Sequence, residues 1–314
     1  MRLLVTGGSG YIGSIMTKAL VERGDFVRVL DSMLYGNHLD SSYEGSEVIN
    51  GDINDDRSLN KAIADVDAVI HLAAIVGDQA CDLNKERAIH TNYLAARNIA
   101  HSCAKNGKRL LFLSTCSVYG AKPGSVITES DSVLPLSIYA ITKLAAEEAV
   151  QSSGCDHVIL RLGTVYGYSP RMRFDLVINL MIAQALQLGS ITVFGGDQFR
   201  PFIHVKDVVE NSMRAVDSEA TGVFNLGGSN HQICGVGKKI RDLTKCRINL
   251  FADIKDPRNY AVDSTKARQV LGAKFSRDIA DAVDEIQFAL KRGTLKSFDD
   301  PTYCNAEWLR RFRC

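Results

Sequence analysis

Two side chains suited to proton transfer, Tyr139 and Lys143, stand four residues apart. On a helix this spacing places both side chains on one face. The hydroxyl of a free tyrosine has a pKa of about 10, and a nearby ammonium group lowers that pKa because it favours the phenolate. The pair therefore predicts a proton-transfer site. The alternative is an exposed pair of helix neighbours without a catalytic role.

A glycine-rich segment near the start of the chain has the composition of a phosphate-binding loop. It lies between an apolar run and a helical pattern, and it reads Gly7-Gly8-Ser9-Gly10-Tyr11-Ile12-Gly13. Glycines let the backbone approach a pyrophosphate, and the start of a helix offers free N–H groups and the positive end of the helix dipole. The segment predicts a dinucleotide site with contacts from Gly7, Gly10, Tyr11, Ile12 and Gly13. A glycine turn without a ligand is the alternative.

Carboxylates follow the next two apolar runs. Asp31 ends the second run, where a carboxylate can accept hydrogen bonds from an adenosine ribose and repels a 2′-phosphate. This favours NAD over NADP as the cofactor. Gly51-Asp52-Ile53 follows the third run, so we expect Asp52 and Ile53 to contact the adenine end of the cofactor. An ordinary Asx turn is the alternative role for Asp52.

The elements that must position these residues follow a regular alternation. The predicted strands are 3–6, 26–30, 48–49, 68–72, 110–114 and 158–160, and the main helices between them are 86–105 and 139–150. Apolar strands that alternate with helices predict a parallel sheet covered on both faces, and right-handed crossovers make it doubly wound. After about residue 165 the rhythm changes, with further helices predicted at 174–188, 264–271 and 279–291. The fold class is therefore α/β, a doubly wound parallel sheet (Rossmann) with a smaller C-terminal α/β region.

Composition restricts the possible partners. Lys plus Arg is 37 and Asp plus Glu is 36, for a net charge of +1, which argues against a protein that binds nucleic acid through its phosphates. No apolar run is long enough for a membrane span, and the N-terminus lacks the apolar region of a signal peptide. The eight cysteines are scattered without a C-x-x-C pair, which favours free thiols, a cytoplasmic location and no metal site.

These motifs, in this order, resemble those of the extended short-chain dehydrogenase/reductases, in the nucleotide-sugar epimerase/dehydratase branch. The resemblance covers nearly the whole chain, and its motifs are TGGSGYIG, Asp31, Gly51-Asp52-Ile53, His71-Leu72-Ala73-Ala74, the segment STCSVYG from Ser114, YAITK from Tyr139, RLGTVYG from Arg161, RPFIHVKDV from Arg200 and FNLG from Phe224. The resemblance implies an NAD-dependent enzyme that acts on a nucleoside-diphosphate sugar, and a homodimer built through helices 86–105 and 139–150.

The resemblance also implies roles for single residues. Tyr139 takes the proton from a sugar hydroxyl, Lys143 lowers its pKa and holds the nicotinamide ribose, and Thr115 binds the same sugar oxygen. The remaining cofactor contacts are Leu72, Ala73, Ala74 and Asn92. The substrate contacts are Thr164, Arg171, Arg173, Arg200 and Arg258, of which Arg200 and Arg258 match the family's diphosphate clamp.

The change of rhythm after about residue 165 divides the chain. It predicts a dinucleotide-binding domain over 1–165, to which strands near 201–226 return, and a mainly substrate-binding region over 166–300. A C-terminal tail over 301–314 has no counterpart in the family pattern. Because no proline-rich linker separates the two regions, we expect them to pack closely.

One departure from the family pattern reduces the number of possible activities. The family's 4,6-dehydratases carry Asp-Glu directly after the active-site Thr, whereas this chain has Cys116 and Ser117. A serine is a poor acid or base at neutral pH, so dehydration is disfavoured. We favour a 4-epimerase that acts through a transient 4-keto sugar. A C4 dehydrogenase or 4-ketoreductase is the main alternative, and a non-catalytic NAD sensor is another.

Overall fold

The chain was described by a computed structural model, which covers residues 1–39, 43, 45–251, 253 and 259–312. Its centre is a seven-stranded parallel sheet in the order β11-β7-β5-β4-β1-β2-β3. The strands are β1 (Arg2–Thr6), β2 (Phe26–Asp31), β3 (Ser46–Asn50), β4 (Ala68–His71), β5 (Arg109–Thr115), β7 (His157–Leu162) and β11 (Gly222–Leu226). The strand order reverses between β1 and β4, so the sheet is doubly wound, as predicted from the sequence.

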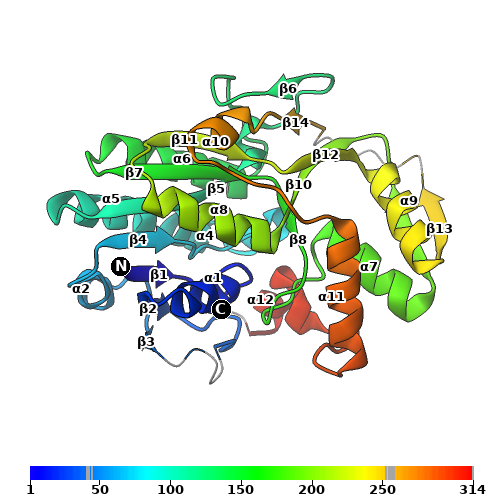
Figure 1. Cartoon of the computed structure of the whole chain (residues 1–314), viewed down its shortest axis with the longest axis horizontal. Coiled ribbons are helices and arrows are strands. Elements are labelled where there is room, and N and C mark those ends of the chain that lie inside the picture. The colour runs from blue at the N-terminus through cyan, green and yellow to red at the C-terminus, as the bar shows by residue number, and fades with distance from the viewer. Residues whose placement is uncertain (40–42, 44, 252, 254–258, 313–314) are drawn as a thin grey trace.

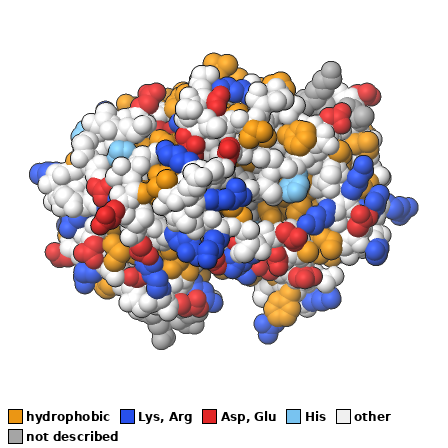
Figure 2. Space-filling view, turned by 45° about the horizontal axis from the view of Figure 1, so that its top comes forward, with side chains coloured by type: hydrophobic (Ala, Val, Ile, Leu, Met, Phe, Trp, Pro, Cys, Tyr) orange, Lys and Arg blue, Asp and Glu red, His pale blue; other side chains and the backbone are white. Residues whose placement is uncertain are grey.

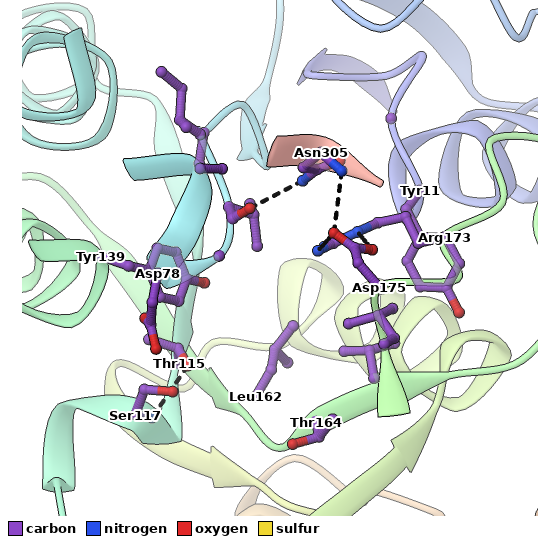
Figure 3. A pocket seen from close by; sticks show the side chains of 18 of the residues that line it. Tyr11, Asp78, Thr115, Ser117, Tyr139, Leu162, Thr164, Arg173, Asp175 and Asn305 are labelled. Atoms are coloured by element: carbon purple, nitrogen blue, oxygen red, sulfur yellow. Dashed lines mark hydrogen bonds and ion pairs between the residues drawn. The ribbon is translucent and has the colours of Figure 1, made fainter. Parts of the chain in front are cut away.

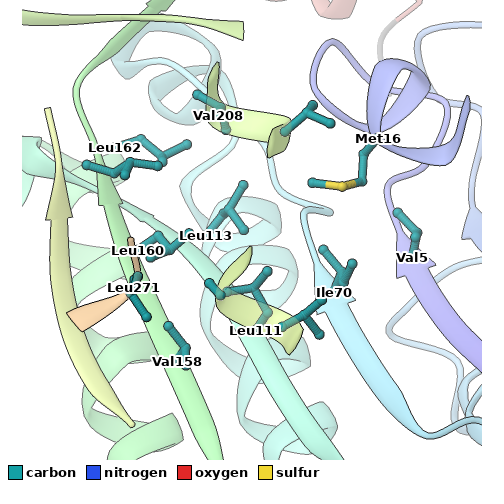
Figure 4. Packing of buried hydrophobic residues seen from close by; sticks show 14 of the residues in the cluster. Val5, Met16, Ile70, Leu111, Leu113, Val158, Leu160, Leu162, Val208 and Leu271 are labelled. Carbon is teal, nitrogen blue, oxygen red and sulfur yellow. The ribbon is translucent and has the colours of Figure 1, made fainter. Parts of the chain in front are cut away.

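Helices cover both faces of this sheet because its central strands are apolar on both sides. One face packs on α1 (Gly13–Glu22), α8 (Val205–Asp217) and α10 (Thr265–Val270). The other packs on α2 (Asp56–Ile63), α5 (Ala95–Lys105) and α6 (Ile138–Ser152). Figure 4 shows the first face, where Val5, Ile70 and Leu111 meet Met16 and Val208. Within β1, Val5 and its neighbour Leu4 point to opposite faces, which is the period of a strand.

The second region lies at one end of the sheet (Figure 1). It contains a three-stranded sheet of β12 (Ser229–Gln232), β10 (Phe199–His204) and β8 (Thr164–Tyr166), and a two-stranded sheet of β13 (Arg247–Phe251) and β9 (Ser190–Phe194). Its helices are α7 (Val177–Leu188), α9 (Ile233–Thr244) and α11 (Ile279–Lys291). A further small sheet joins β14 (Ala261–Val262) to β6 (Val126–Ile127). Of the segment 201–226, β11 pairs with β7 in the main sheet, whereas β10 belongs to the small sheet beside β8.

The helix predicted over 86–105 is interrupted. The structure has α4 (Lys85–Ile89), a π-helical turn over His90–Leu94, and then α5. A π turn inserts one residue more than an α-turn, which redirects the side chains on it, and such turns are frequent at functional sites. The helix predicted from Phe174 begins only at Val177, because Phe174 is buried in the preceding loop against the ring of Tyr303.

The C-terminal segment folds back onto the molecule. Its helix α12 (Asn305–Phe312) packs against α3 (Asp78–Leu83), and in Figure 1 it is seen between α1 and α11. None of the helices within the described ranges is long and apolar enough to cross a membrane. On the face shown in Figure 2, Lys and Arg side chains are interspersed with Asp and Glu.

Candidate active site

A cavity of about 1150 Å³ lies at the carboxyl ends of the central strands and is lined by both regions. This is the edge at which open α/β sheets bind ligands, beside the point where the strand order reverses. Pockets for a single small ligand occupy roughly 300–1,000 Å³, so the cavity has room for more than one. Figure 3 shows Thr115 and Tyr139 on one side of it and Tyr11 and Arg173 on the other.

The glycine segment forms a cradle at the start of α1. Gly7 has a φ of +73°, and a Cβ there would lie 2.7 Å from the backbone nitrogen of Ala73. A Cβ on Gly13 would lie 2.0 Å from the carbonyl oxygen of Gly7. Both positions therefore require glycine, whereas the site of a Cβ on Gly10 is open except for that same carbonyl. The cradle fits a dinucleotide, because it lines the cavity with backbone at a helix N-terminus.

Asp31 is held at the end of β2 for hydrogen bonding. Its carboxylate accepts hydrogen bonds from the backbone N–H groups of Ser9, at 2.9 Å, and Met33, at 2.8 Å. Burial raises the pKa of Asp31, and these two donors oppose that rise. Asp52 and Ile53 also line the cavity. The Asp52 carboxylate accepts a hydrogen bond from the Asn54 backbone at 2.9 Å, so it forms an Asx turn as well.

Leu72, Ala73 and Ala74 line the cavity where β4 ends, but Asn92 does not, so its predicted role needs correction. Asn92 is buried on the π-helical turn. Its side chain accepts a hydrogen bond from the N–H of Ile75 at 2.8 Å and donates one to the carbonyl of Ile75 at 2.9 Å. Asn92 therefore positions the loop after β4, and the redirected turn allows this reach.

The three predicted catalytic residues all line the cavity. Thr115 ends β5, and Tyr139 and Lys143 lie in the first turns of α6, which is capped by the hydroxyl of Ser137. The side chain of Tyr139 forms a hydrogen bond with that of Thr115. The Lys143 ammonium nitrogen donates to the carbonyl oxygen of Leu113 at 2.6 Å.

The electrostatics of this pair differ from the sequence-based expectation. Burial raises the pKa of Tyr139, and the groups that lower it are Arg173 and Thr115 rather than Lys143. The reason is that Lys143 is directed to Leu113 and is itself desolvated, which lowers its pKa to about 7. Without a cofactor, burial therefore holds the pKa of Tyr139 above its ordinary value.

A buried polar network supports the catalytic side of the cavity. Arg161 on β7 donates to both carboxylate oxygens of Glu147 on α6, with the shortest contact at 2.6 Å. Arg161 also donates to the hydroxyl of Tyr119 at 2.8 Å, and that hydroxyl donates to Asn225 at 2.7 Å. Ser114, next to Thr115, donates to Glu147 as well. The network fixes the end of β5 against α6, β7 and β11.

The two residues after Thr115 offer no carboxylate. Cys116 is fully buried with its thiol directed to the carbonyl of Arg161, and burial raises the pKa of that thiol. Ser117 lines the cavity. A carboxylate that sequence reasoning did not assign to the site is Asp78 at the start of α3, which lines the cavity beside Tyr139 (Figure 3).

The predicted substrate residues separate into two groups. Thr164 and Arg200 line the cavity within the small sheet, and the Arg200 guanidinium lies 5.9 Å from the centroid of the Tyr260 ring. Arg171 lies over the ring of Tyr35, in the loop after β2, and thus on the side of Asp31. Arg173, also lining the cavity, binds Asp175. Arg258 lies outside the described residues.

Comparison with known proteins places the chain in a family that depends on NAD, which agrees with the glycine cradle at the cavity. A model of the "NAD dependent epimerase/dehydratase family" matches residues 3–227. UDP-glucuronic acid decarboxylase 2 of Arabidopsis thaliana is 30% identical over an alignment of 291 residues that covers 87% of this chain. The match spans 64% of that plant protein, so this chain covers less than two thirds of its length. The uncharacterized UDP-glucose epimerase YtcB of Bacillus subtilis is 31% identical over 86% of this chain and 92% of its own.

A solved structure shows the same fold. MoeE5 in complex with UDP-glucuronic acid and NAD superposes with a TM-score of 0.81 at 30% identity. The superposition covers 94% of this chain and 100% of MoeE5. The relatives thus include both decarboxylases and epimerases.

Proposed function

Because the chain belongs to the NAD-dependent epimerase/dehydratase family, we propose that it is a nucleotide-sugar 4-epimerase acting through a transient 4-keto sugar. The observation that best supports this activity is that Thr115 and Tyr139 lie together at the cavity, while the two residues after Thr115 are a buried Cys116 and Ser117. The Thr115–Tyr139 pair can exchange the proton of a sugar hydroxyl, as the reversible oxidation of that carbon by NAD requires, while the two positions after Thr115 provide no carboxylate for the removal of water.

The protein residues handle the proton. A sugar hydroxyl bound between Thr115 and Tyr139 would pass its proton to the Tyr139 oxygen, while the Thr115 hydroxyl holds the sugar oxygen. NAD, when held by the glycine cradle and Asp31, supplies a hydride acceptor and a positive ring charge that favours the phenolate. The lowered pKa of Lys143, about 7, lets this amine exchange protons at neutral pH. For inversion, the keto sugar must present its other face, and the wide cavity gives it room to turn.

At the other end of the cavity, we assign the binding of the substrate diphosphate to Arg200. This side chain is buried at the cavity wall beside Tyr260, and a guanidinium binds phosphate oxygens in pairs. The substrate class is therefore a nucleoside-diphosphate sugar, as the complex of MoeE5 with UDP-glucuronic acid also suggests.

The similarity to UDP-glucuronic acid decarboxylase 2 supports a second candidate. The same oxidation at C4 of a uronic acid gives a β-keto acid, which can lose carbon dioxide without any further catalytic group. The first step is shared, so the fate of the 4-keto sugar distinguishes the activities. A net C4 dehydrogenase or ketoreductase would differ again, since it exchanges its cofactor in each turnover.

Product analysis tests this proposal. The purified protein with NAD is incubated separately with UDP-glucose, UDP-N-acetylglucosamine, UDP-glucuronic acid and GDP-mannose. The nucleotide sugars are then separated, and their masses are measured by mass spectrometry. We expect one substrate to yield an isomer of unchanged mass without accumulation of NADH. Loss of carbon dioxide, loss of water or stoichiometric NADH would each contradict a 4-epimerase, and turnover of none would support an NAD sensor.

The proposal includes a cytoplasmic homodimer. Apolar side chains are exposed at Ile89 on α4 and at Ile141 on α6, and these helices belong to the segments through which the resemblance implies dimerisation. The cysteines within the described ranges are free, as suits a reducing compartment. Sedimentation of the wild type and of Ile141→Asp tests the dimer, which the substitution should weaken.

A further inference from the structure

Two buried arginines lie at the cavity, but only one of them is paired with a carboxylate. Arg173 donates to both oxygens of Asp175, each at 2.9 Å. Arg171, only 2% exposed, forms no ion pair with any described carboxylate, and its Nη1 atom has no hydrogen-bond partner among the described residues. Its contacts are the side-chain oxygen of Asn305, at 2.6 Å from Nη2, and the ring of Tyr35. A buried cation without an anion is costly, so this cluster favours an anionic ligand.

The position of Arg171 indicates which anion. The neighbouring Ser169 donates to the carbonyl oxygen of Tyr11 at 2.7 Å and contacts the hydroxyl of Ser14 at 3.1 Å. Arg171 is thus anchored above the glycine cradle and the start of α1. Tyr35, beneath its guanidinium, follows the strand that ends in Asp31. The pyrophosphate of a dinucleotide lies at this helix start, between the ribose at the acidic residue and the nicotinamide at the catalytic residues.

The C-terminal helix α12 completes this wall. Its first residues, Asn305 and Ala306, line the cavity. Asn305 donates from its side chain to the carbonyl of Val76 at 2.9 Å and from its backbone to Asp175 at 3.2 Å. Trp308 donates to the carbonyl of Leu34 at 2.7 Å. The helix therefore joins the loops after β2, β4 and β8, and it directs the positive end of its dipole toward the cavity.

We propose that Arg171 and the first turn of α12 form a second phosphate-binding wall, which contacts the NAD pyrophosphate from the side opposite the glycine cradle and retains the cofactor. Asn305 orients the guanidinium, and Trp308 fixes the helix. An epimerase must keep its cofactor because the same hydride is returned. The inference itself requires only NAD binding, so it goes beyond the proposed activity and does not depend on it.

The test is ligand binding to the full chain after removal of bound cofactor. Calorimetry with NAD, ADP-ribose, adenosine and UDP is performed on the wild type and on Arg171→Gln. A charge-assisted hydrogen bond corresponds to roughly tenfold to a hundredfold in affinity, so NAD and ADP-ribose should weaken by that factor. Adenosine and UDP should bind within about twofold of the wild type, because they do not carry the cofactor pyrophosphate.

The control is Arg292→Gln, since Arg292 is an exposed arginine over the ring of Phe288 and does not line the cavity. Unchanged affinity for NAD in Arg171→Gln would overturn the proposal. A loss of affinity for adenosine as large as the loss for NAD would overturn it too, because the substitution would then have distorted the whole site. A loss for UDP alone would assign Arg171 to the substrate diphosphate instead.

The role of α12 has its own measurement, the rate at which bound NAD is released into excess unlabelled cofactor. Trp308→Phe keeps the aromatic ring but removes the donor to Leu34, and Asn305→Ala removes the contact to Arg171. Each should release NAD roughly twofold to tenfold faster. Unchanged release in both, with unchanged circular dichroism, would contradict the role of the helix. Because no turnover is involved, failure here is distinct from failure of the epimerase proposal.

Discussion

Two buried arginines, one in the polar network behind Thr115 and one in the cavity wall, differ in how their charge is balanced. Arg161 is paired with Glu147 through both carboxylate oxygens, and this pairing outweighs burial and raises its pKa. Burial and the charge of Arg173 lower the pKa of Arg171 to about 10, and its side-chain partner is the neutral Asn305. The first arginine belongs to the framework, because its charge is satisfied within the fold. The second belongs to a ligand site, because its charge is satisfied only when an anion binds.

The largest effect should come from the catalytic side of the cavity. Tyr139→Phe removes the hydroxyl that exchanges the proton, and general acid–base groups contribute about 10²–10⁴-fold to rates. We expect a loss of that size in turnover, with NAD content and unfolding free energy close to those of the wild type. Steady-state kinetics and cofactor quantification measure it. A fully active variant would remove Tyr139 from the mechanism.

The framework arginine gives the largest expected change in stability. Glu147→Gln leaves Arg161 buried without its carboxylate, and removing one partner of a buried ion pair costs about 3–5 kcal/mol. Urea unfolding of the cofactor-free protein measures this loss. A decrease below about 1 kcal/mol, as for an exposed pair, would show that the network does not hold the framework together.

Arg171→Gln should behave in the opposite way. Without NAD its unfolding free energy should not fall by more than about 1 kcal/mol, since no ion pair is broken and a buried charge is removed. With NAD present the variant should gain less stability than the wild type, by about 1.4 kcal/mol for each tenfold loss in affinity. Thermal unfolding at several NAD concentrations provides both values. A large loss of unfolding free energy without NAD would show that Arg171, like Arg161, belongs to the framework.

A separate effect should follow pH through Lys143. Burial lowers its pKa to about 7, so at pH values above this the unfolded chain binds a proton that the folded, cofactor-free protein has lost. Stability should therefore rise with pH from about 7 to about 10. Lys143→Met, which does not titrate, should lack this contribution. Unfolding across that pH range measures the difference, and parallel curves for the two proteins would refute the shifted pKa.

Sequence reasoning succeeded where chemistry is carried by a contiguous segment at a strand end. The glycine cradle, Asp31 and Thr115 each follow an apolar run, so their places at the sheet edge follow from strand order alone. The main strands and α6 were predicted for the same reason: their apolar period is local.

The features of the site that the sequence did not predict depend on contacts between distant segments. The hydrogen bonds of Asn305 to Arg171 and Val76 join residues from three loops, and no local pattern marks them. The π-helical turn that redirects Asn92 was hidden in an ordinary helical pattern. The spacing of Tyr139 and Lys143 predicted a shared face but not the hydrogen bond that turns Lys143 toward Leu113.

The central claim is tested most directly with a nucleotide sugar that carries deuterium at C4. The account predicts that the NAD-loaded protein converts it to the C4 epimer with the deuterium retained, because the hydride leaves and returns within one bound complex. Deuterium recovered in released NADH, or a product that has lost carbon dioxide, would contradict the account.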